Sequence, residues 1–398
     1  MYKALGMYVF AGSFSIGVMN AGYKIDRVLE ISDEMLEQNA KHFIHNYPDI
    51  SVIKRSEWNT DAYKEELKEE EYDLLYANPP CSGLSNINRN ASADSDVNKH
   101  IYDVVRMINT IQPKSFIIEN APTLITRGKK ILDYLVQALK DNYIITIIRD
   151  YAGNHRVPMK RQRTLVIGTK ADLFPPINSF PVLYSEYEYM TVRQCLEGVE
   201  YAHSNMTLVP ERSCKDLEKY YYTVKRGDSI MSTLAKSINS VLDIQVLKEL
   251  GLSENRMSQI LKLKEKMDNG KGAYEKSPSR LKEDIAPSLA SVIEFIHPTE
   301  DRPLYIREYA RLMGYPDTFE FVEDAKVPYI QAIAQGVPVN FAFWIANELR
   351  QNILNHSCIS WSLDRDYKVR YLNYCNKKHI IEKYFTLEDF LNTDNICK

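Results

Sequence analysis

The sequence predicts an α/β fold, with a doubly wound, mostly parallel sheet and a smaller, irregular second domain. Over residues 1–172, short apolar runs alternate with amphipathic helical patterns, which is typical of a parallel sheet covered by helices. Over residues 173–302 the alternation stops, and over residues 303–352 it resumes. We therefore expect the first and third segments to form one sheet domain, with residues 353–398 as an extension of unknown role.

The strands and helices of the first segment follow from its hydrophobic pattern. Continuous apolar runs, the pattern of strands buried on both faces, occupy residues 8–13, 26–32, 72–77, 114–120 and 164–170. Apolar residues spaced i, i+3 and i+4 predict helices over residues 14–23, 33–47, 97–111 and 130–142. Such sheets bind ligands at the carboxyl ends of their strands, so functional side chains are expected there.

The rest of the chain is less regular. Residues 173–302 are rich in Tyr, Ser and Lys and contain one clear helix over residues 253–267, with Ser253 placed to cap it and Gly270 soon after its end. The regular pattern returns in residues 306–319 and in a long apolar helix over residues 339–354. Aromatic and basic residues are interleaved in the extension, which is expected to be ordered.

Composition excludes several classes of protein. The 398 residues are 44% hydrophobic and 26% charged, as in an ordinary globular chain long enough for two domains. The net charge of −3 argues against a strongly cationic nucleic-acid binder, although a local basic cleft is enough to contact phosphates. Six scattered cysteines without a CxxC pattern indicate a reducing compartment, here the cytoplasm. No stretch approaches the roughly 20 apolar residues of a membrane span.

A cysteine in a stiff turn is the first candidate for chemistry. In "YANPPCSGLSN", Cys81 follows a predicted strand and is bracketed by Pro79, Pro80 and Gly83. Proline fixes φ and removes a backbone donor, and glycine allows a close approach to another group. These residues alone leave open a nucleophile or a structural cysteine beside an ordinary turn.

Charged residues follow other predicted strands. Glu119 comes directly after an apolar run, which tends to raise its pKa and suits it to donate a proton. Arg161 and Arg163 are two apart on a predicted strand, so both guanidinium groups would project from one face and could hold an anion or a planar polar edge. A structural carboxylate and an exposed edge strand are the alternatives.

A nucleotide-like ligand is suggested by the first two strands. The turn "FAGSFSIG" joins a strand to a helix, and Glu30 ends the second strand, a position that commonly binds ribose hydroxyls. The absence of a GxGxxG pattern weakens the case for a dinucleotide. A solvated glutamate at a strand end remains the alternative for Glu30.

Taken in order, these motifs resemble the DNA (cytosine-5) methyltransferases. The series is "FAGSFSIGVMNAGY", "PPCSG", "ENAP", "VPMKRQR", a variable region, "REYARLMGYPDTF" and "QGVPVN", and it extends to about residue 350. The resemblance implies S-adenosylmethionine as methyl donor without a metal, and double-stranded DNA as substrate. It also implies a target-recognition domain over residues 173–302, a monomer, and a possible partner restriction endonuclease.

The resemblance also implies individual roles. Cys81 would add to C6 of cytosine, Glu119 would hold and protonate N3, and Arg163 would support the base, with Arg161 nearby. The implied cofactor pocket consists of Phe10, Ala11, Gly12, Ser13, Glu30, Ile31, Glu57, Trp58, Asn78, Pro80, Gln335, Gly336 and Val337.

Some positions depart from the family pattern. Met159 stands where the family has Gln, Ala121 where it has Val, and Ala334–Gln335 where it has Gly-Asn. None of these changes removes a group that the chemistry requires.

Two rival functions remain at this stage: the same methylation on RNA, and a catalytically silent DNA-binding protein. The long variable region favours DNA, because reading a duplex sequence needs a groove-facing module. Its lysine-rich residues 262–284 are the stretch most expected to face phosphates, unless they form a solvated face.

Overall fold

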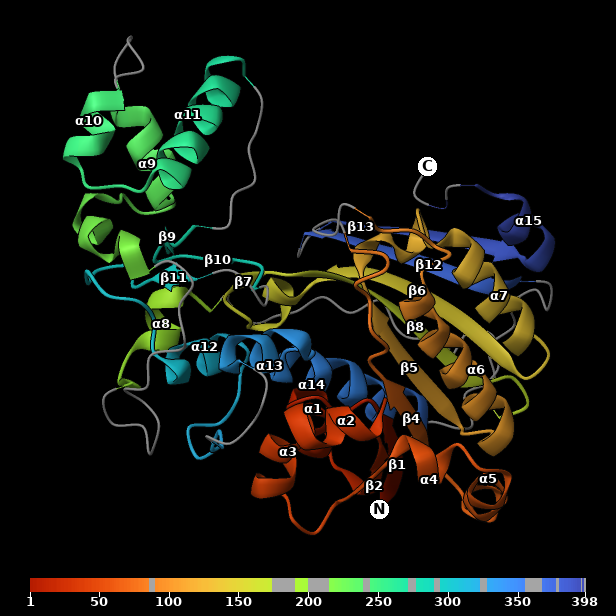
Figure 1. The fold of residues 1–398 in the computed structure, drawn as a ribbon. Helices are drawn as coiled ribbons and strands as arrows, with labels where there is room; N and C mark the ends of the chain where they lie inside the picture. The colour runs from red at the N-terminus through yellow and green to blue at the C-terminus, as the bar shows by residue number, and fades with distance from the viewer. Residues whose placement is uncertain are drawn as a thin grey trace.

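The computed structural model shows a large sheet domain and a smaller lobe beside it (Figure 1). It describes residues 1–85, 90–173, 190–199, 215–238, 244–270, 277–289, 294–322, 328–354, 367–376, 379–394 and 396. Residues 271–276, in the middle of the stretch expected to face phosphates, lie outside this description.

A mostly parallel sheet forms the centre of the large domain, as predicted. Its strand order within the described residues is β13-β12-β6-β8-β5-β4-β1-β2-β3. Only β8 and β13 run antiparallel to their neighbours. The strands are β1 (Tyr2–Met7), β2 (Tyr23–Leu29), β3 (Ser51–Ile53), β4 (Leu74–Ala77), β5 (Ser115–Asn120), β6 (Tyr143–Tyr151), β8 (Gln162–Lys170), β12 (Tyr367–Asn376) and β13 (His379–Thr386).

Helices cover both faces of the sheet, and each face has its own hydrophobic core. The first core includes Phe14, Phe319 and Phe341 and is covered by α1 (Ser13–Asn20), α3 (Lys41–Asn46), α12 (Ile306–Leu312), α13 (Tyr329–Gln335) and α14 (Val339–Glu348). The second core includes Trp58 and Phe116 and is covered by α4 (Arg55–Trp58), α5 (Asp61–Lys68), α6 (Lys99–Ile111), α7 (Lys129–Leu139) and α15 (Leu387–Asn392).

The predicted helix over residues 33–47 contains an irregular turn. It consists of α2 (Asp33–Met35), a π-helical segment (Leu36–Ala40) and α3. π-helical turns inside α-helices are frequent at functional sites. This one places the buried side chain of Asn39 opposite Gln335, as described below.

The smaller lobe is a helical unit with a core of its own. It contains α9 (Ile230–Ser237), α10 (Ile244–Glu249), α11 (Glu254–Asp268) and a 3-10 segment (Lys215–Thr223). Ser253 caps α11 by accepting a hydrogen bond from the Arg256 backbone N–H, as predicted. The sequence did not predict α9 and α10, because they are too short to show a clear periodic pattern.

Short strands and α8 join this lobe to the sheet domain. β9 (Ser279–Arg280) pairs with β11 (Phe295–Ile296), and β10 (Ala286–Pro287) pairs with β7 (Met159–Lys160). The helix α8 (Val192–Leu196) packs against α12. Because β7 immediately precedes Arg161, the connection reaches the candidate site directly.

The REYARLMGYPD stretch fixes this junction. Arg307 donates to the carbonyl oxygens of Pro316 and Phe319, and Arg311 pairs with Asp317. Arg311 also donates to the carbonyl oxygen of Glu197, just after α8. The motif therefore has a structural role, holding the segment after α8, where the chain enters the smaller lobe.

The C-terminal extension is ordered where it is described, as expected. The strand β12 lies parallel to β6, and β13 and α15 follow it (blue in Figure 1). Val369, Tyr371 and Leu372 are at most 2% exposed, so β12 belongs to the core of the sheet domain. No helix in the described ranges is long and apolar enough to cross a membrane.

Candidate active site

The predicted catalytic side chains lie at the ends of three neighbouring strands. Cys81 follows β4, Glu119 lies on β5, and Arg163 lies on β8. The strands β4 and β5 are parallel neighbours, and β5 pairs with β8 so that Glu119 lies opposite Leu165. The thiol of Cys81 is close enough to both charged groups for their charges to change its pKa. The structure therefore brings these three residues together, as the sequence predicted.

Hydrogen bonds hold the cysteine turn in shape. Asn120 Nδ2 donates to the Pro79 carbonyl oxygen at 3.3 Å, and the Leu84 N–H donates to the Cys81 carbonyl oxygen at 3.0 Å. At Gly83, a Cβ atom would lie 2.5 Å from Asn98 Oδ1. A side chain at this position would push the segment before α6 away, so glycine is required for the close approach.

Glu119 and Arg163 form an ion pair that is largely buried. Arg163 Nε lies 2.7 Å from Glu119 Oε1, and Glu119 is only 2% exposed. Neither atom, however, makes a hydrogen bond of acceptable geometry in the described structure. Burial raises the pKa of Glu119, and the two arginines, Arg163 and Arg161, oppose the rise. A carboxyl group of this kind can donate a proton to a ring nitrogen.

The electrostatic setting of Cys81 has opposing contributions. Burial raises the pKa of the Cys81 thiol, and the nearby Glu119 carboxylate adds to this effect. The guanidinium groups of Arg163 and Arg161 act in the opposite direction. Protonation of Glu119 would remove the negative charge and so favour the thiolate, which is the nucleophilic form.

Arg161 occupies a different position from the one predicted. It lies between β7 and β8, because β7 pairs with β10 and interrupts the expected continuous strand. Its guanidinium donates to the carbonyl oxygens of Leu289 (3.1 Å), Ala334 (3.0 Å) and Gly336 (2.9 Å). The prediction that both arginines project from one strand is therefore wrong for Arg161, which joins the end of the smaller lobe to the segment that precedes α14.

The turn between β1 and α1 has an unusual backbone. Tyr8 and Phe10 have φ values of 68° and 48°, and Gly12 has a φ of 91°. Positive φ is uncommon for residues with a side chain, and such strain clusters at binding sites. A Cβ atom at Gly12 would lie 2.2 Å from the Phe43 ring. Glycine is therefore required here both because of its positive φ and because a side chain would clash with Phe43.

Glu30 is fully buried beside this turn. Its Oε1 accepts a hydrogen bond from the Ile31 N–H at 2.6 Å, whereas its Oε2 has no partner in the described structure. Burial raises the pKa of Glu30 to about 7. Trp58 Nε1 donates to the Glu30 carbonyl oxygen at 2.7 Å, which fixes the indole beside it, whereas Glu57 is exposed on α4.

A third segment closes the site from the opposite side. Gln335 Oε1 accepts a hydrogen bond from Asn39 at 2.5 Å, and its carbonyl oxygen accepts one from Asn78 at 3.1 Å. At Gly336, a Cβ atom would lie 2.0 Å from Ser13 Oγ, which has no hydrogen-bond partner in the described structure. The turn after β1, Glu30 and the segment around Gln335 thus surround buried polar atoms that lack partners, as expected where a polar ligand binds.

The remaining predicted pocket residues lie on the same segments. Ala11 and Val337 are completely buried, Ile31 is 6% exposed, and Pro80 is partly exposed in the cysteine turn. Sequence reasoning missed Asn39, which belongs to no recognised motif and reaches Gln335 only through the π-helical turn. Within the described residues there is no group of three or more His, Cys, Asp or Glu that could hold a metal ion.

Comparisons with known proteins agree on one family. The sequence matches the family of C-5 cytosine-specific DNA methylases over residues 2–351. It is 27% identical to the type II methyltransferase M.PspPI of Psychrobacter sp. over 363 residues, covering 87% of this chain and 79% of the relative. It is also 27% identical to M.Sau96I of Staphylococcus aureus, covering 87% of this chain and 75% of that protein.

Solved structures show the same fold. A DNA modification methyltransferase described as encoded within an Escherichia coli prophage aligns with a TM-score of 0.58 and 21% identity, covering 89% of this chain and all of the other. The DNMT2 protein of Spodoptera frugiperda aligns with a TM-score of 0.57 and 10% identity, covering 88% of this chain. These two similarities support the arrangement of strands and helices described above.

Proposed function

Since the chain belongs to the family of C-5 cytosine-specific DNA methylases, we propose that it attacks its target base with Cys81 after flipping that base out of a specific duplex sequence. Membership of this family identifies the reaction as methyl transfer to C5 of cytosine in DNA, with S-adenosylmethionine as the donor. The rival functions, RNA methylation and silent DNA binding, are not favoured by these relatives. The base lies inside a stacked duplex, so it must leave the stack before a side chain can reach it.

The observation that carries the proposal is the meeting of Cys81, Glu119 and Arg163 at neighbouring strand ends. C5 of cytosine is a weak nucleophile until a thiolate adds at C6. Protonation of N3 by Glu119 stabilises the charge that this addition develops. Arg163 and Glu119 form a buried ion pair beside Cys81, which suits them to bind the polar edge of a base.

The cofactor pocket fits a nucleoside with an amino-acid tail. The unpartnered Oε2 of Glu30 would accept hydrogen bonds from ribose hydroxyls, and Trp58 and Ile31 would lie beside the adenine. The amino-acid end of the cofactor would be held by Phe10 to Ser13 and by Gln335 to Val337. When bound there, S-adenosylmethionine supplies the methyl group that the activated C5 takes up.

The first prediction concerns Glu30. The ionised carboxylate is the better acceptor for two hydroxyls, and burial raises the pKa of Glu30 to about 7 in the ligand-free chain. Affinity for S-adenosylmethionine is therefore expected to rise with pH up to about 7 and then to level off. In Glu30→Gln the affinity should be lower by about 1.5–3 kcal/mol above that pH, and independent of pH.

Titration calorimetry between about pH 5.5 and pH 8.5 would measure both effects. Glu65→Gln is the control, since Glu65 is exposed on the nearby helix α5 and belongs to no predicted site. Equal affinities of wild type and Glu30→Gln across this range would exclude Glu30 as the ribose ligand.

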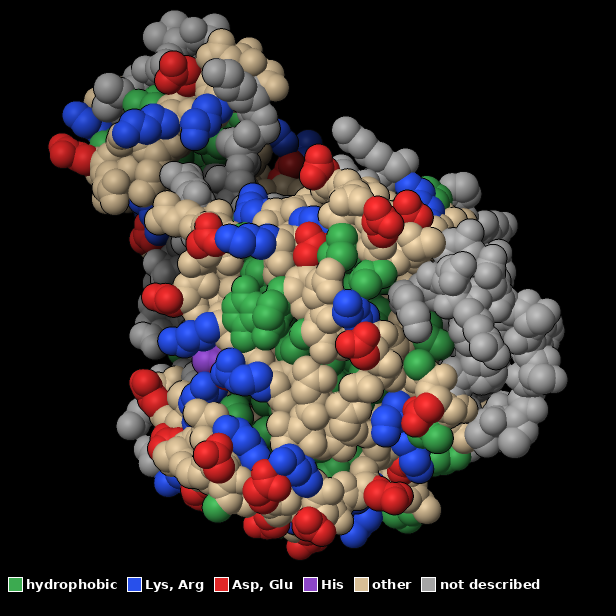
Figure 2. Space-filling view, turned by 90° about the vertical axis from the view of Figure 1, so that its right-hand side faces the viewer, with side chains coloured by type: hydrophobic (Ala, Val, Ile, Leu, Met, Phe, Trp, Pro, Cys, Tyr) green, Lys and Arg blue, Asp and Glu red, His purple; other side chains and the backbone are tan. Residues whose placement is uncertain are grey.

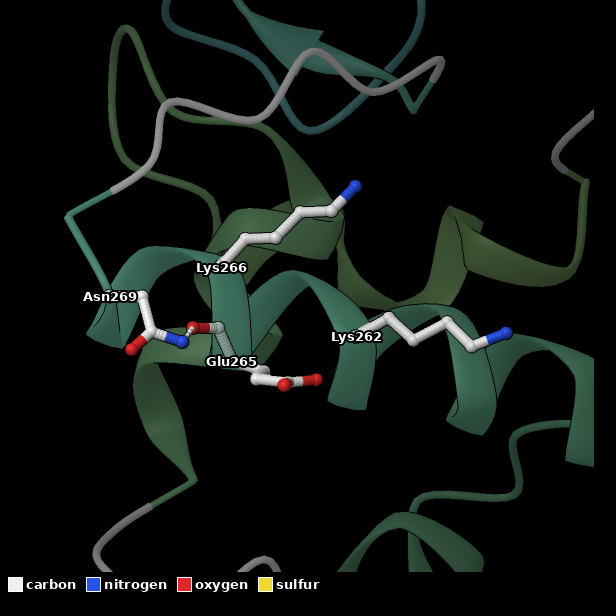
Figure 3. A pocket seen from close by; sticks show the side chains of 4 residues that line it. All are labelled: Lys262, Glu265, Lys266 and Asn269. Carbon is white, nitrogen blue, oxygen red and sulfur yellow. Dashed lines mark hydrogen bonds between the residues drawn. The ribbon is translucent and has the colours of Figure 1, made fainter.

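Residues 173–302 are proposed as the target-recognition domain. On α11, Lys262 and Lys266 lie four residues apart and are exposed, and no ion pair to either is found among the described residues. With Glu265 and Asn269 they line a shallow pocket of about 230 Å³, where Figure 3 shows both ammonium groups pointing to the same side. In Figure 2, Lys and Arg side chains appear on the face of the smaller lobe that is turned toward the viewer. These features suit the α11 lysines to contact DNA phosphates.

The second prediction tests this surface. Each lysine that neutralises a phosphate should contribute about 0.9 to the slope of log affinity against log salt concentration. Replacing both Lys262 and Lys266 with alanine should therefore reduce the slope by about 1.8 and weaken binding to all DNA sequences alike. Fluorescence anisotropy with duplex DNA over a salt series would measure the slope.

Lys264→Ala is a matched control on the same helix. Lys264 is paired with Asp268 at 3.2 Å, so its removal should change the slope little. An unchanged slope in the double variant would show that α11 does not face the phosphates.

The biological partners are part of the same proposal. Two curated relatives are named as type II methyltransferases, which supports a cognate restriction endonuclease that acts on the same sequence. We place the protein in the cytoplasm of a bacterial or phage-infected cell, acting as a monomer.

Bisulfite sequencing of DNA from a methylation-free host that expresses the chain would identify the DNA sequence that is methylated. Labelled methyl transfer to RNA instead of DNA would refute the proposal.

A further inference from the structure

The C-terminal extension, residues 353–398, begins just after the part of the chain that matches the family. It is nevertheless built into both cores of the sheet domain. Tyr371 and Phe390 belong to the core that contains α6 and α7, and Leu372 and Tyr374 belong to the core that contains α14. The extension therefore contacts both layers of helices that flank the sheet.

On the first face, the extension holds the start of α7. Lys129, the first residue of α7, donates from Nζ to the Phe390 carbonyl oxygen at 3.1 Å. The same ammonium group lies 4.5 Å from the centre of the Phe390 ring and 2.5 Å from Asp133 Oδ1. The Lys129 side chain is only 12% exposed, and Phe390 is completely buried. Cation–π contacts are strongest when they are shielded from water in this way.

The segment before α7 is hydrogen-bonded to the turn that carries Cys81. Thr123 Oγ1 and Arg127 Nη1 both donate to the Leu84 carbonyl oxygen, the latter at 3.1 Å, and Arg127 also reaches the Ser85 carbonyl oxygen at 3.4 Å. Leu84 is buried and lies three residues after Cys81. A displacement of the first turn of α7 would therefore move the thiol.

On the second face, the extension reaches the segment that leads from β6 to Arg161. The Tyr374 ring meets Trp344 edge-on at 6.2 Å, and Trp344 stacks on His155 at 3.7 Å. His155 Nε2 lies 2.6 Å from Asp150 Oδ2, with both side chains buried. This cluster lies at the end of β6, immediately before β7 and Arg161.

We infer that the C-terminal extension positions the catalytic groups, with Lys129 and Phe390 as the positioning residues for Cys81. This inference depends on the proposed role of Cys81. Neither residue touches the substrate. A thiol must approach C6 in a near-attack geometry, and misplacement by about 1 Å can slow a reaction by about 100-fold. Removing the Lys129–Phe390 contact should therefore slow addition to C6. It should change cofactor binding little, because most of the proposed cofactor pocket lies on the turn after β1, at Glu30 and around Gln335.

The test uses the full chain with Lys129→Met or Phe390→Ala, and duplex DNA containing 5-fluorocytosine at the target. With S-adenosylmethionine present, a competent site becomes covalently linked to this DNA, so the reaction gives both the number of competent sites and the rate at each site. The expected result is a rate per site that is lower by roughly 10- to 100-fold, with an unchanged dissociation constant for S-adenosylmethionine. Lys129→Arg and Phe390→Tyr retain the cation and the ring, and should restore most of the rate.

Lys130→Met is the matched control. Lys130 neighbours Lys129 on α7, but it is 80% exposed and its described partner Asp94 is 78% exposed, so its loss should not change the rate. A variant that merely unfolds would reduce the number of competent sites without changing the rate at each. Wild-type rates per site in Lys129→Met and Phe390→Ala would overturn the inference, whereas failure of the wild type to form the linkage would refute the proposed function instead.

Discussion

Cys81→Ser is expected to abolish methyl transfer to DNA while leaving the affinities for DNA and S-adenosylmethionine unchanged. A serine hydroxyl is far less ionised and less nucleophilic than a thiol near neutral pH, so addition at C6 cannot proceed. Loss of a catalytic nucleophile lowers turnover by about 10⁴-fold or more. The two side chains have nearly the same shape, so the turn held by Asn120 and Gly83 should be preserved. Transfer of a labelled methyl group under single-turnover conditions would measure the loss.

Cys195→Ser provides the control. Cys195 is a buried thiol on α8, beside Arg311 and Asp317. The Cys195→Ser variant should therefore retain wild-type turnover per folded molecule. Measurable turnover by Cys81→Ser at a rate similar to wild type would show that Cys81 is not the nucleophile.

Glu119→Gln should lower the rate of methyl transfer by roughly 10²- to 10⁴-fold, the usual contribution of a general acid. Glutamine has the size of glutamate but carries no acidic proton. Because burial raises the pKa of Glu119, the wild-type carboxyl group stays protonated to a higher pH than an ordinary glutamate. The wild-type rate should therefore fall as the pH rises above this raised pKa, and the Gln variant should lack that fall.

Single-turnover rates over a pH series would test both parts of this prediction. Glu119→Asp retains the acid but shortens the side chain, so it should recover part of the lost rate. If Glu119→Gln transferred methyl groups at the wild-type rate, N3 protonation by Glu119 would be excluded.

The sheet domain could be predicted from sequence because its signal is local. The strands β4 and β5 are buried apolar runs, and the amphipathic helices α6 and α7 follow them. The prediction of a strand over residues 8–13 is wrong, because β1 occupies Tyr2–Met7 and residues 8–12 form the turn into α1. The strand β2 contains Lys24, Asp26 and Arg27, and β3 is only three residues long, so neither shows a continuous apolar run. The strands of the extension were not predicted. In β12, aromatic and basic residues are interleaved, and Tyr371 and Tyr374 become core residues only because β6 lies beside them. That pairing joins segments more than 200 residues apart in sequence, so no local sequence pattern predicts it.

In the candidate site, too, some residues could be placed from the sequence and others could not. Cys81 and Glu119 could be placed because residues at or just beyond the carboxyl end of a buried parallel strand lie at the ligand-binding edge of the sheet. The role of Arg161 could not be predicted, since its partners Leu289 and Gly336 are 128 and 175 residues away in the chain. Asn39 reaches Gln335 across 296 residues. Contacts of this kind depend on how the smaller lobe and α14 pack against the sheet, and a single sequence does not specify that packing.

The central claim is that Cys81 forms a covalent bond with the target cytosine in DNA. Duplex DNA with 5-fluorocytosine at the target position tests it most directly, because addition at C6 and methyl transfer to C5 can proceed but the fluorine cannot leave as a proton does. We expect a denaturant-resistant complex that requires S-adenosylmethionine, with peptide mapping that places the linkage at Cys81 and no complex with Cys81→Ser. Linkage at Cys195 or at any other cysteine, or a complex formed with RNA alone, would contradict the account.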